Sequence, residues 1–454
     1  MTNKIKIKKG LQIPLLGEPQ ELLRGVVKSD FVRIYPEDFH GVTPKLTVKA
    51  GDRVKAGSPL FYDKNRSSVL FASPVSGVVA VVERGEKRRI LHIEIKTDKE
   101  IEYQDFGKKR VSALLEDGVK SSILEAGLWF LIKQRPYDVI ANPEKTPRDI
   151  FVTGFDSSPL APSYDFILND LEGDLQTGLD ALAKLTPGKV YLGVKKGSAF
   201  TKKFDVEAMR KEANIEVVEV EGLHPAGNVG VQINRIAPVN KGETVWTLSA
   251  LDVAVIGRLF DEGIVDLTRT VALSGSEVKQ TGYYKMPIGT QLSSLFDGNV
   301  SEGLPLRYIS GNVLTGTKID KDGSLRAYDS QITVIPEGKN VYEILGWASL
   351  SPKRYSAGST YLRLKKRYRL DARILGGARA IIVSNEYDRV FPMDIYPEQL
   401  LKSIIAFNID KMENLGIYEV APEDFALCEF VDTSKLEIQR IVRKGLDLLR
   451  KEME

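Results

Sequence analysis

Cysteine is almost absent from this chain of 454 residues, since Cys428 is the only one. One thiol cannot form an internal disulfide, and it excludes an all-cysteine zinc or iron–sulfur centre built by this chain alone. Histidine is also scarce: His40, His92 and His224 lie far apart, without the spacing of metal ligands. We therefore expect no bound metal.

Long apolar runs and a strong excess of charge are missing as well. The longest apolar patch, residues 127–132, is far shorter than the roughly 18 consecutive residues of a membrane span. The N-terminus, MTNKIKIKKG, has no apolar segment of the signal-peptide type. A formal net charge of +3 does not indicate a nucleic acid or an anionic lipid as partner. These absences predict a cytoplasmic chain that meets a membrane only through partner proteins.

What is present is typical of a globular protein, with 43% hydrophobic and 28% charged residues. The length is sufficient for two to four domains, and the pattern predicts an α/β multidomain fold. We divide the chain at residues 1–105, 106–265, 266–375 and 376–454. The first part is β-rich, the second alternates strands and helices, the third returns to short β runs, and the last is helical.

Residues 1–105 contain two glycine- and proline-punctuated β halves, LTVKAGDRVKAGSPLFY and VLFASPVSGVVAVV. The first carries GDxVxxG and the second SPxxG, so this part resembles the barrel-sandwich domain of biotinyl and lipoyl carriers. In those carriers the hairpin between the halves displays a modified lysine, and Lys64 is the nearest candidate here. The hairpin is longer than a carrier's, and its neighbours Arg66, Ser67 and Ser68 differ from those expected, which favours an unmodified docking domain.

Residues 106–265 alternate strand and helix signals. Buried-strand runs occur at 150–153, 190–194 and 215–220, and helical patterns at 179–185 and 204–213. Such alternation favours βαβ units in a mainly parallel, Rossmann-like sheet. Ligands of these sheets lie beyond the carboxyl ends of the strands, so the loops after Thr153, Val194 and Val220 are the places to search. The last loop, EGLHPAGNVG, offers His224 for ligand contact, and its glycines let backbone approach a ligand or a neighbouring helix.

The stretch 246–318 joins two architectures. Leu248, Leu251, Val255 and Leu259 have helical spacing, which predicts a helix from the start of this stretch. The β runs 268–274 and 307–310 follow, between glycines. This order resembles the β-grasp (SLBB-like) module that soluble subunits of NADH-oxidising complexes place after a flavin-binding domain.

The rest of the chain adds β runs, ITVIP and YEILGWAS, and a basic stretch with seven Lys or Arg residues between Lys353 and Arg369. This stretch is either a solvated face or a docking surface for an acidic or membrane-borne partner. From Pro397 the pattern is helical, and Thr433 or Ser434 is expected to cap the last helix.

Over nearly its whole length the chain resembles the NqrA family of sodium-translocating NADH:quinone reductases. More distantly it resembles a soluble electron-transfer component of the Rnf complex and the flavin-binding component of complex I. Those flavin-binding relatives carry a GxGGAGFP segment whose backbone cradles the flavin phosphate. Here the corresponding segment is EAGLWFLIKQRPYD from Glu125, with bulky side chains after Gly127. They would occupy the space of the phosphate, so we expect no tightly bound flavin. The tail also lacks the CxxCxxC motifs of the iron–sulfur relatives.

The resemblance implies a peripheral component on the inner face of the bacterial membrane, without a redox cofactor or catalytic residues of its own. The complex passes electrons from NADH to ubiquinone and exports sodium, with NADH used by other subunits. The expected partners are those subunits, especially the membrane-embedded NqrB protein. Family association suggests quinone binding. Between residues 129 and 137 the chain supplies the apolar and donor groups that a quinone needs. Together with one residue of the later loop, the candidates are Trp129, Phe130, Arg135, Tyr137 and His224.

Three alternatives stay open at this point. Trp129 and Phe130 could instead fill the vacated flavin pocket as core residues. The chain could also be an Rnf-type electron-transfer protein, which the missing cysteines disfavour, or a lipoyl- or biotinyl-like carrier or docking protein, which the longer hairpin at Lys64 disfavours.

Overall fold

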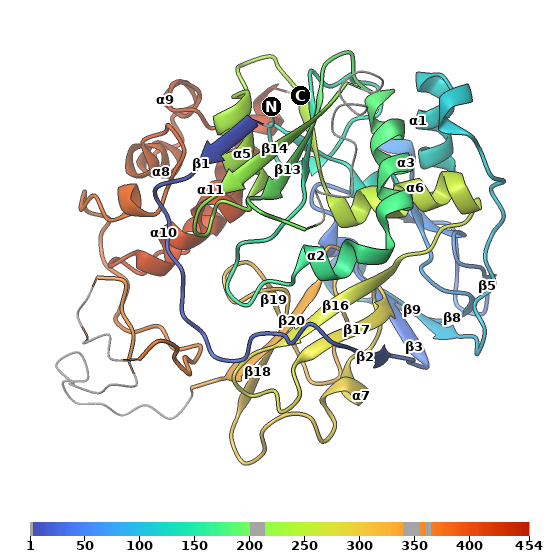
Figure 1. Cartoon of the computed structure of the whole chain (residues 1–454), viewed down its shortest axis with the longest axis horizontal. Coiled ribbons are helices and arrows are strands. Elements are labelled where there is room, and N and C mark those ends of the chain that lie inside the picture. Colours follow the sequence, from blue (N-terminus) through green and yellow to red (C-terminus); the bar gives the residue numbers. More distant parts are fainter. Residues whose placement is uncertain (1–2, 200–213, 339–353, 359–360, 362–364, 454) are drawn as a thin grey trace.

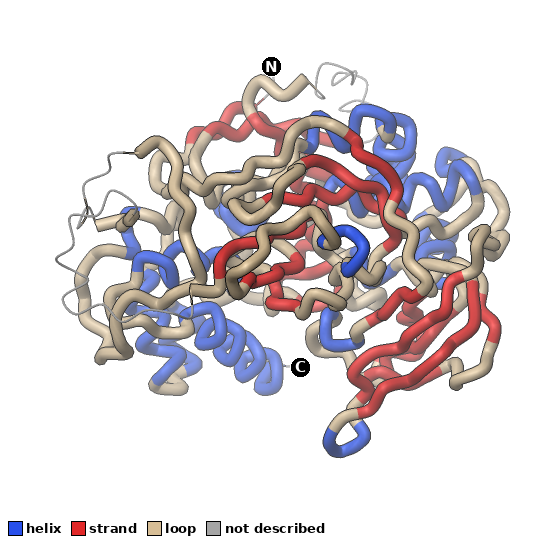
Figure 2. The backbone as a smooth tube through the Cα atoms, turned by 90° about the horizontal axis from the view of Figure 1, so that it is seen from below, coloured by secondary structure: helices blue, strands red, loops and turns tan. Residues whose placement is uncertain are grey.

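The structure is a computed structural model that describes residues 3–199, 214–338, 354–358, 361 and 365–453. The strands of the α/β part lie between one group of helices and the C-terminal helices, and the strands of the barrel sandwich lie at the edge of the molecule (Figures 1 and 2). The predicted fold class is confirmed: a barrel-sandwich part, an α/β part, a β-grasp part and a helical part follow one another along the chain.

The α/β part is built on a seven-stranded sheet. In spatial order its strands are β1 (Asn3–Lys6), β14 (Ile215–Glu221), β13 (Val190–Lys195), β12 (Ile150–Thr153), β15 (Val245–Ser249), β10 (Lys133–Arg135) and β11 (Val139–Ile140). The first five are parallel, and β10 runs antiparallel to β15. The three strands predicted at 150–153, 190–194 and 215–220 are therefore confirmed.

Helices cover both faces of this sheet. They are α3 (Glu172–Ala183) and α6 (Ala250–Glu262) on one face and α5 (Val229–Ile236) on the other; this part also contains α1 (Glu116–Glu125), which packs against the barrel sandwich, and the short α2 (Tyr164–Ile167). Alternate residues of a strand point to opposite faces. In β14, Val217 packs in the cluster that contains α3 and α6, whereas Val218 and Val220 pack with α5 and the C-terminal helices. Strands buried on both faces are typical of parallel sheets.

Helix α6 begins later than the sequence pattern predicted. Residues 245–249 form strand β15, and the helix starts only at Ala250. Ser249 is the N-cap, with its Oγ accepting the backbone N–H of Asp252 at 3.1 Å, and Gly263 ends the helix at φ +76°. The error arose because a continuous apolar run has the same appearance in a buried strand and in a buried helix.

The barrel-sandwich part has two small sheets. One contains β3 (Phe31–Ile34), β9 (Ile90–Thr97), β8 (Gly77–Arg84) and β5 (Arg53–Val54); the other contains β4 (Pro44–Leu46), β6 (Pro59–Asp63) and β7 (Arg66–Ala72). Lys64 is exposed in the turn between β6 and β7, so the hairpin position predicted for it is confirmed. The hairpin contacts the α/β part, because Arg66 Nη1 donates to the carbonyl of Ile140 at 3.4 Å.

The β-grasp part is a six-stranded sheet with a short helix, α7 (Ser293–Phe296). Its strands are, in spatial order, β19 (Thr317–Ile319), β18 (Leu306–Ser310), β20 (Gln331–Pro336), β16 (Thr268–Ser274), β17 (Gly282–Pro287) and β2 (Leu23–Val26). The predicted runs 268–274, 307–310 and ITVIP are all strands. The helical pattern at 204–213, the run YEILGWAS and part of the basic stretch lie outside the described residues.

The C-terminal part contains α8 (Pro397–Ile405), α9 (Ile409–Asn414), α10 (Ala426–Val431) and α11 (Ile438–Met453). The predicted cap is wrong, because α11 starts at Ile438 and not after Thr433 or Ser434. The Ser434 hydroxyl donates to the carbonyl of Ala380, and the Asp432 carboxylate accepts the N–H groups of Ser434 and Leu436. The Ser434 hydroxyl is therefore bonded within this turn and does not cap α11.

The N-terminus also differs from the predicted division. Strand β1 joins the seven-stranded sheet beside β14, and β2 joins the β-grasp sheet beside β17, so the first 30 residues run across two other parts before the barrel sandwich begins. The parts share cores: one cluster contains Phe61 and Phe71 of the barrel sandwich together with Trp246 of β15. No described helix has the length and hydropathy required to cross a membrane.

Candidate functional site

A cavity of about 240 Å³ lies at the point where the order of strands in the parallel sheet reverses. Chain order runs from β12 outward through β13 and β14, and then returns to place β15 on the other side of β12. The crevice beyond the ends of β12 and β15 is the switch point at which such sheets bind ligands. Thr153 and Ser249, the last residues of those strands, both line the cavity.

Two of the three predicted loops reach this cavity. The loop after Thr153 contributes Phe155, Asp156 and Ser158. The loop after β14 contributes His224, Gly227 and Asn228. The loop after Val194 is not among the lining segments that the structure describes. Other parts close the cavity, with Tyr328 and Ser330 from the β-grasp part and Glu423 from the C-terminal part.

Arg135 ends strand β10 and is 1% exposed. Its Nη1 donates to Asp138 at 2.5 Å and its Nη2 to Glu423 at 3.3 Å, while Nε is buried without a hydrogen-bond partner among the described residues. Burial opposes the charge of Arg135, but the nearby carboxylates outweigh it and raise its pKa. Burial also works against ionisation of Asp138, yet Arg135, Lys133 and Arg443 hold the pKa of Asp138 well below its usual range. Arg135 is therefore a permanent cation, and its Nε–H is a donor without a described partner.

His224 lies on the opposite side of the switch point and is 4% exposed. Its Nδ1 lies 3.1 Å from the hydroxyl of Ser157, which also accepts the N–H of Gly227, and its Nε2 is buried without a partner in the described part of the chain. Burial lowers the pKa of His224 to about 4, so the ring is neutral near pH 7. When the Ser157 hydroxyl donates to Nδ1, Nε2 carries the proton and becomes a second free donor.

The glycines of this loop serve the packing of chain against chain. A Cβ on Gly227 would lie 2.7 Å from the backbone N of Ser157, and one on Gly230 would lie 2.4 Å from the Asp424 carboxylate. The expected close approach is therefore made by neighbouring segments of this chain.

Several other charged groups complete the wall. Asp252 accepts from Arg269 at 2.6 Å, and the Nε of Arg269 has no partner among the described residues. Burial raises the pKa of Asp156, whose carboxylate accepts the N–H and the hydroxyl of Ser158. The hydroxyl of Tyr328 donates to the carbonyl of Phe130 at 2.8 Å. Sequence reasoning did not single out Lys133, Asp156, Asp252, Arg269 and Glu423; Asp156 lies in a loop that it named, whereas Arg269 and Glu423 come from distant parts of the chain that only folding brings to this cavity.

The other three candidates do not line the cavity. Trp129 is fully buried, its Nε1 donates to the carbonyl of Ala141 at 2.8 Å, and its ring meets Trp246 edge-on at 5.3 Å. Phe130 packs against Phe39 of the barrel sandwich at 5.1 Å. Tyr137 lies in the apolar cluster shared with the C-terminal helices. Of the five candidates, the structure brings only Arg135 and His224 to one cavity.

The cysteine and the candidate carrier lysine are not among the residues that line the switch-point cavity. No group of three or more His, Cys, Asp or Glu among the described residues is arranged to hold a metal ion. Cys428 is buried, and burial raises the pKa of its thiol far above the usual value. Lys64, at its hairpin tip, donates its backbone N–H to the carbonyl of Thr43 at 2.8 Å.

Known proteins match this chain along its length. Three family models match: the NqrA N-terminal barrel-sandwich hybrid domain over residues 5–98, the NqrA second alpha/beta domain over 114–265, and the NQRA C-terminal domain over 270–321. The NqrA protein of the Na(+)-translocating NADH-quinone reductase of Neisseria meningitidis is 36% identical over 99% of this chain and 100% of its own length. The chain belongs to the NqrA family. The NqrA proteins of Haemophilus influenzae and Neisseria gonorrhoeae are each 35% identical, with the same coverage.

Membership in the NqrA family decides between the three interpretations of the sequence. The chain is one component of an oxidoreductase complex, the Na(+)-translocating NADH-quinone reductase, and neither the Rnf-type nor the carrier interpretation is retained. Two chains from crystal structures of NAD+-reducing [NiFe]-hydrogenase also match, at 12% and 11% identity over 51% and 74% of this chain and 48% and 61% of theirs. Their TM-scores of 0.37 and 0.38 are too low to support any inference.

Proposed function

We propose that this protein binds the headgroup of a quinone in the switch-point cavity, with Arg135 and His224 as hydrogen-bond donors to its two carbonyl oxygens. The observation that carries the proposal is the pair of buried nitrogens without partners in the described part of the chain, Arg135 Nε and His224 Nε2, on two residues that line one cavity. Buried polar atoms are normally hydrogen-bonded, so an unpartnered pair indicates groups that water or a ligand satisfies.

The size and walls of the cavity support a ring-sized occupant. About 240 Å³ is below the roughly 300–1,000 Å³ of pockets for drug-sized ligands, so one ring fits while a long tail must lie outside. Leu131, Phe155, Val229 and Leu248 supply apolar wall. A neutral acceptor such as a quinone carbonyl suits the spare groups of this site, because Arg135 Nε donates and cannot accept, while the charge of Arg135 is already balanced by Asp138 and Glu423.

Within the complex we propose a supporting role for this chain. It holds no redox cofactor of its own, and NADH is oxidised on another subunit. It sits as a peripheral component on the inner face of the membrane, reached through contact with the membrane-embedded NqrB protein, and it contributes to assembly. The bulky segment after Gly127 supports the absence of a flavin site, because Trp129 and Phe130 fill that region with core side chains.

The test is quinone affinity of the purified chain, measured by calorimetry with a short-chain ubiquinone. His224→Leu removes the donor and should weaken binding about five- to thirtyfold, as expected for one lost hydrogen bond of about 1–2 kcal/mol. His224→Gln keeps a side-chain donor and should retain part of the affinity. His92→Leu, in the barrel sandwich, is the matched control and should leave affinity unchanged. Equal affinity in the wild type and His224→Leu would place the quinone elsewhere.

A further inference from the structure

A second and larger cavity, of about 700 Å³, lies between the α/β and β-grasp parts. One wall comes from strands β2, β16 and β17, and the other from α2, the turn that follows it and α6. This volume is in the range of pockets that hold small molecules, and a boundary between domains is a common place for them. Nothing in the quinone proposal uses it.

Its walls are apolar along most of their length. Leu22, Phe166, Ile167, Leu171 and Val255 all line the cavity. Leu22 is 51% exposed, and Leu23 beside it is 44% exposed. Large apolar side chains left open beside a cavity indicate a surface that another molecule covers.

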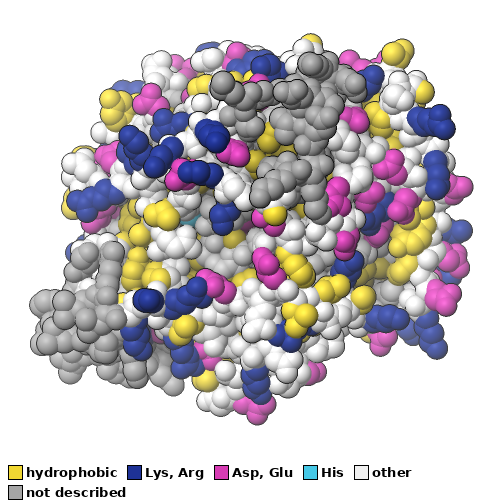
Figure 3. All heavy atoms as spheres, in the orientation of Figure 1, with side chains coloured by type: hydrophobic (Ala, Val, Ile, Leu, Met, Phe, Trp, Pro, Cys, Tyr) yellow, Lys and Arg dark blue, Asp and Glu magenta, His cyan; other side chains and the backbone are white. Residues whose placement is uncertain are grey.

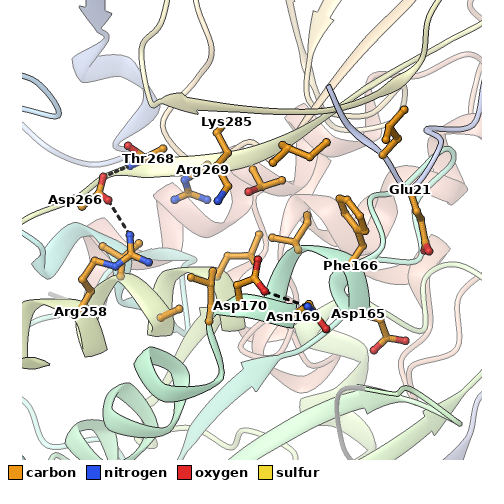
Figure 4. Close-up of a pocket in the computed structure, with 18 residues that line it drawn as sticks. Glu21, Asp165, Phe166, Asn169, Asp170, Arg258, Asp266, Thr268, Arg269 and Lys285 are labelled. Atoms are coloured by element: carbon orange, nitrogen blue, oxygen red, sulfur yellow. Dashed lines mark hydrogen bonds and ion pairs between the residues drawn. The ribbon is translucent and has the colours of Figure 1, made fainter. Parts of the chain in front are cut away.

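Positive charge is concentrated at one place in the cavity. Lys285 points into it from strand β17, and Arg269, whose guanidinium donates to Asp252, lines it from the adjacent strand β16 (Figure 4). The Lys285 side chain has no ion pair or hydrogen bond to a described residue, and neither does the buried Nε of Arg269. Arg258, further along, is already held by Asp174 and Asp266. The unused donors therefore belong to Lys285 and Arg269.

Four carboxylates line the cavity: Asp266 lies beside the cations and is paired with Arg258, and the other three lie on the opposite wall or at the far end (Figure 4). Glu21 and Asp165 are at the opposite end (Figure 4), and Asp165 accepts from Ser198 and the N–H of Ala199. Asp170 accepts from Asn169 at 3.1 Å. A molecule with one negative charge fits this distribution when the charge lies at Lys285, because Arg258 neutralises Asp266 and the acids at the far end meet only the apolar body. On the face drawn in Figure 3, acidic and basic side chains are interspersed.

From this arrangement we propose that the larger cavity binds a single-chain amphiphile with an anionic headgroup, such as a fatty acid. The carboxylate lies between Lys285 and Arg269, and the chain follows the apolar wall toward Phe166 and Leu22. This site is separate from the quinone proposal, although Leu251 and Arg269 line both cavities.

The test is calorimetric binding of octanoate, decanoate and dodecanoate to the full chain below their micellar concentrations. Each buried methylene should tighten binding about fourfold until the cavity is filled. Decanol and decyltrimethylammonium are the neutral and cationic comparisons. Equal or tighter binding of either one, or no saturable binding of decanoate, overturns the proposal.

Lys285 supplies the second arm, because it is exposed and can be replaced without disturbing the core. Lys285→Gln should weaken the binding of decanoate about fivefold. This effect is modest because water screens the charge of an exposed lysine, and Lys285→Arg should restore the affinity. Lys279→Gln, an exposed lysine between the same two strands, is the matched control. Unchanged decanoate affinity in Lys285→Gln contradicts the headgroup assignment. Quinone affinity should be unaffected in Lys285→Gln, so the two proposals can fail independently.

Discussion

The two halves of the segment 125–138 have opposite environments although they are adjacent in sequence. Trp129 and Phe130 pack among apolar side chains of the barrel sandwich and the sheet, with the one polar atom of the Trp129 ring satisfied by Ala141. Arg135, six residues after Trp129, is equally buried but ends in two carboxylates and a nitrogen without a described partner. Burial alone therefore does not separate core from site. What separates them is whether the polar atoms are satisfied within the chain.

Trp129→Ala should produce the largest loss of stability. Removing a fully buried indole leaves a cavity beside Trp246 and costs about 3–5 kcal/mol. The measurement is urea denaturation followed by circular dichroism, with Tyr396→Ala, an aromatic residue 69% exposed, as the control that should change little. The folded fraction should keep wild-type quinone affinity. A large loss of affinity with little loss of stability would put Trp129 in the site.

Arg135→Gln should cost somewhat less stability, about 3 kcal/mol. The change removes the cation that pairs with Asp138 and Glu423. Removing one partner of a buried ion pair destabilises the fold strongly, because the remaining charge is buried without compensation. Adding Asp138→Asn should recover part of the loss, because it removes one uncompensated charge. Denaturant titration of both single variants and the double variant measures the coupling. Additive losses would show that the pair is not coupled.

Acidic pH should reveal the buried state of His224. Its pKa is about 4 in the folded chain and near 6.5 in the unfolded chain, so the unfolded state gains a proton first as the pH falls. Stability from this group is thus complete above about pH 6.5 and is lost down to about pH 4, by about 3 kcal/mol in total. His224→Gln should lack this loss in stability-against-pH curves. Curves of identical slope would show that the ring is not buried and neutral.

The wild-type curve alone would mislead, because Asp424 acts in the opposite direction. Burial and the neighbouring Glu423 raise its pKa to about 7, so the folded state holds this proton more strongly and loses stability as the pH rises toward 7. The difference between wild type and His224→Gln isolates the histidine.

Much of the fold could be predicted from the sequence, since the strands at 150–153, 190–194 and 215–220 and the loops after β12 and β14 follow from local pattern. The helix predicted from residue 246 failed because apolar runs are ambiguous between strand and helix. The cap at Ser434 failed because Asp432 organises that turn. Of the residues that line the switch-point cavity, His224 was a candidate from its loop and Arg135 from the segment 129–137. Arg269 and Glu423 could not be found, since they come from the β-grasp and C-terminal parts and no local pattern carries that contact.

The smallest expected effect comes from Phe130→Leu. Phe130 packs against Phe39 and Phe71, and a leucine of similar shape should repack there at a cost of about 1 kcal/mol. Its ring does not line the switch-point cavity, so quinone affinity should stay within about twofold of wild type in the same calorimetric titration. Phe61→Leu, in the same aromatic cluster, gives the matched comparison for stability. If Phe130→Leu weakens the quinone about tenfold while Phe61→Leu does not, the ring borders the ligand, and the distinction between a packed first half and a binding second half of this segment no longer holds.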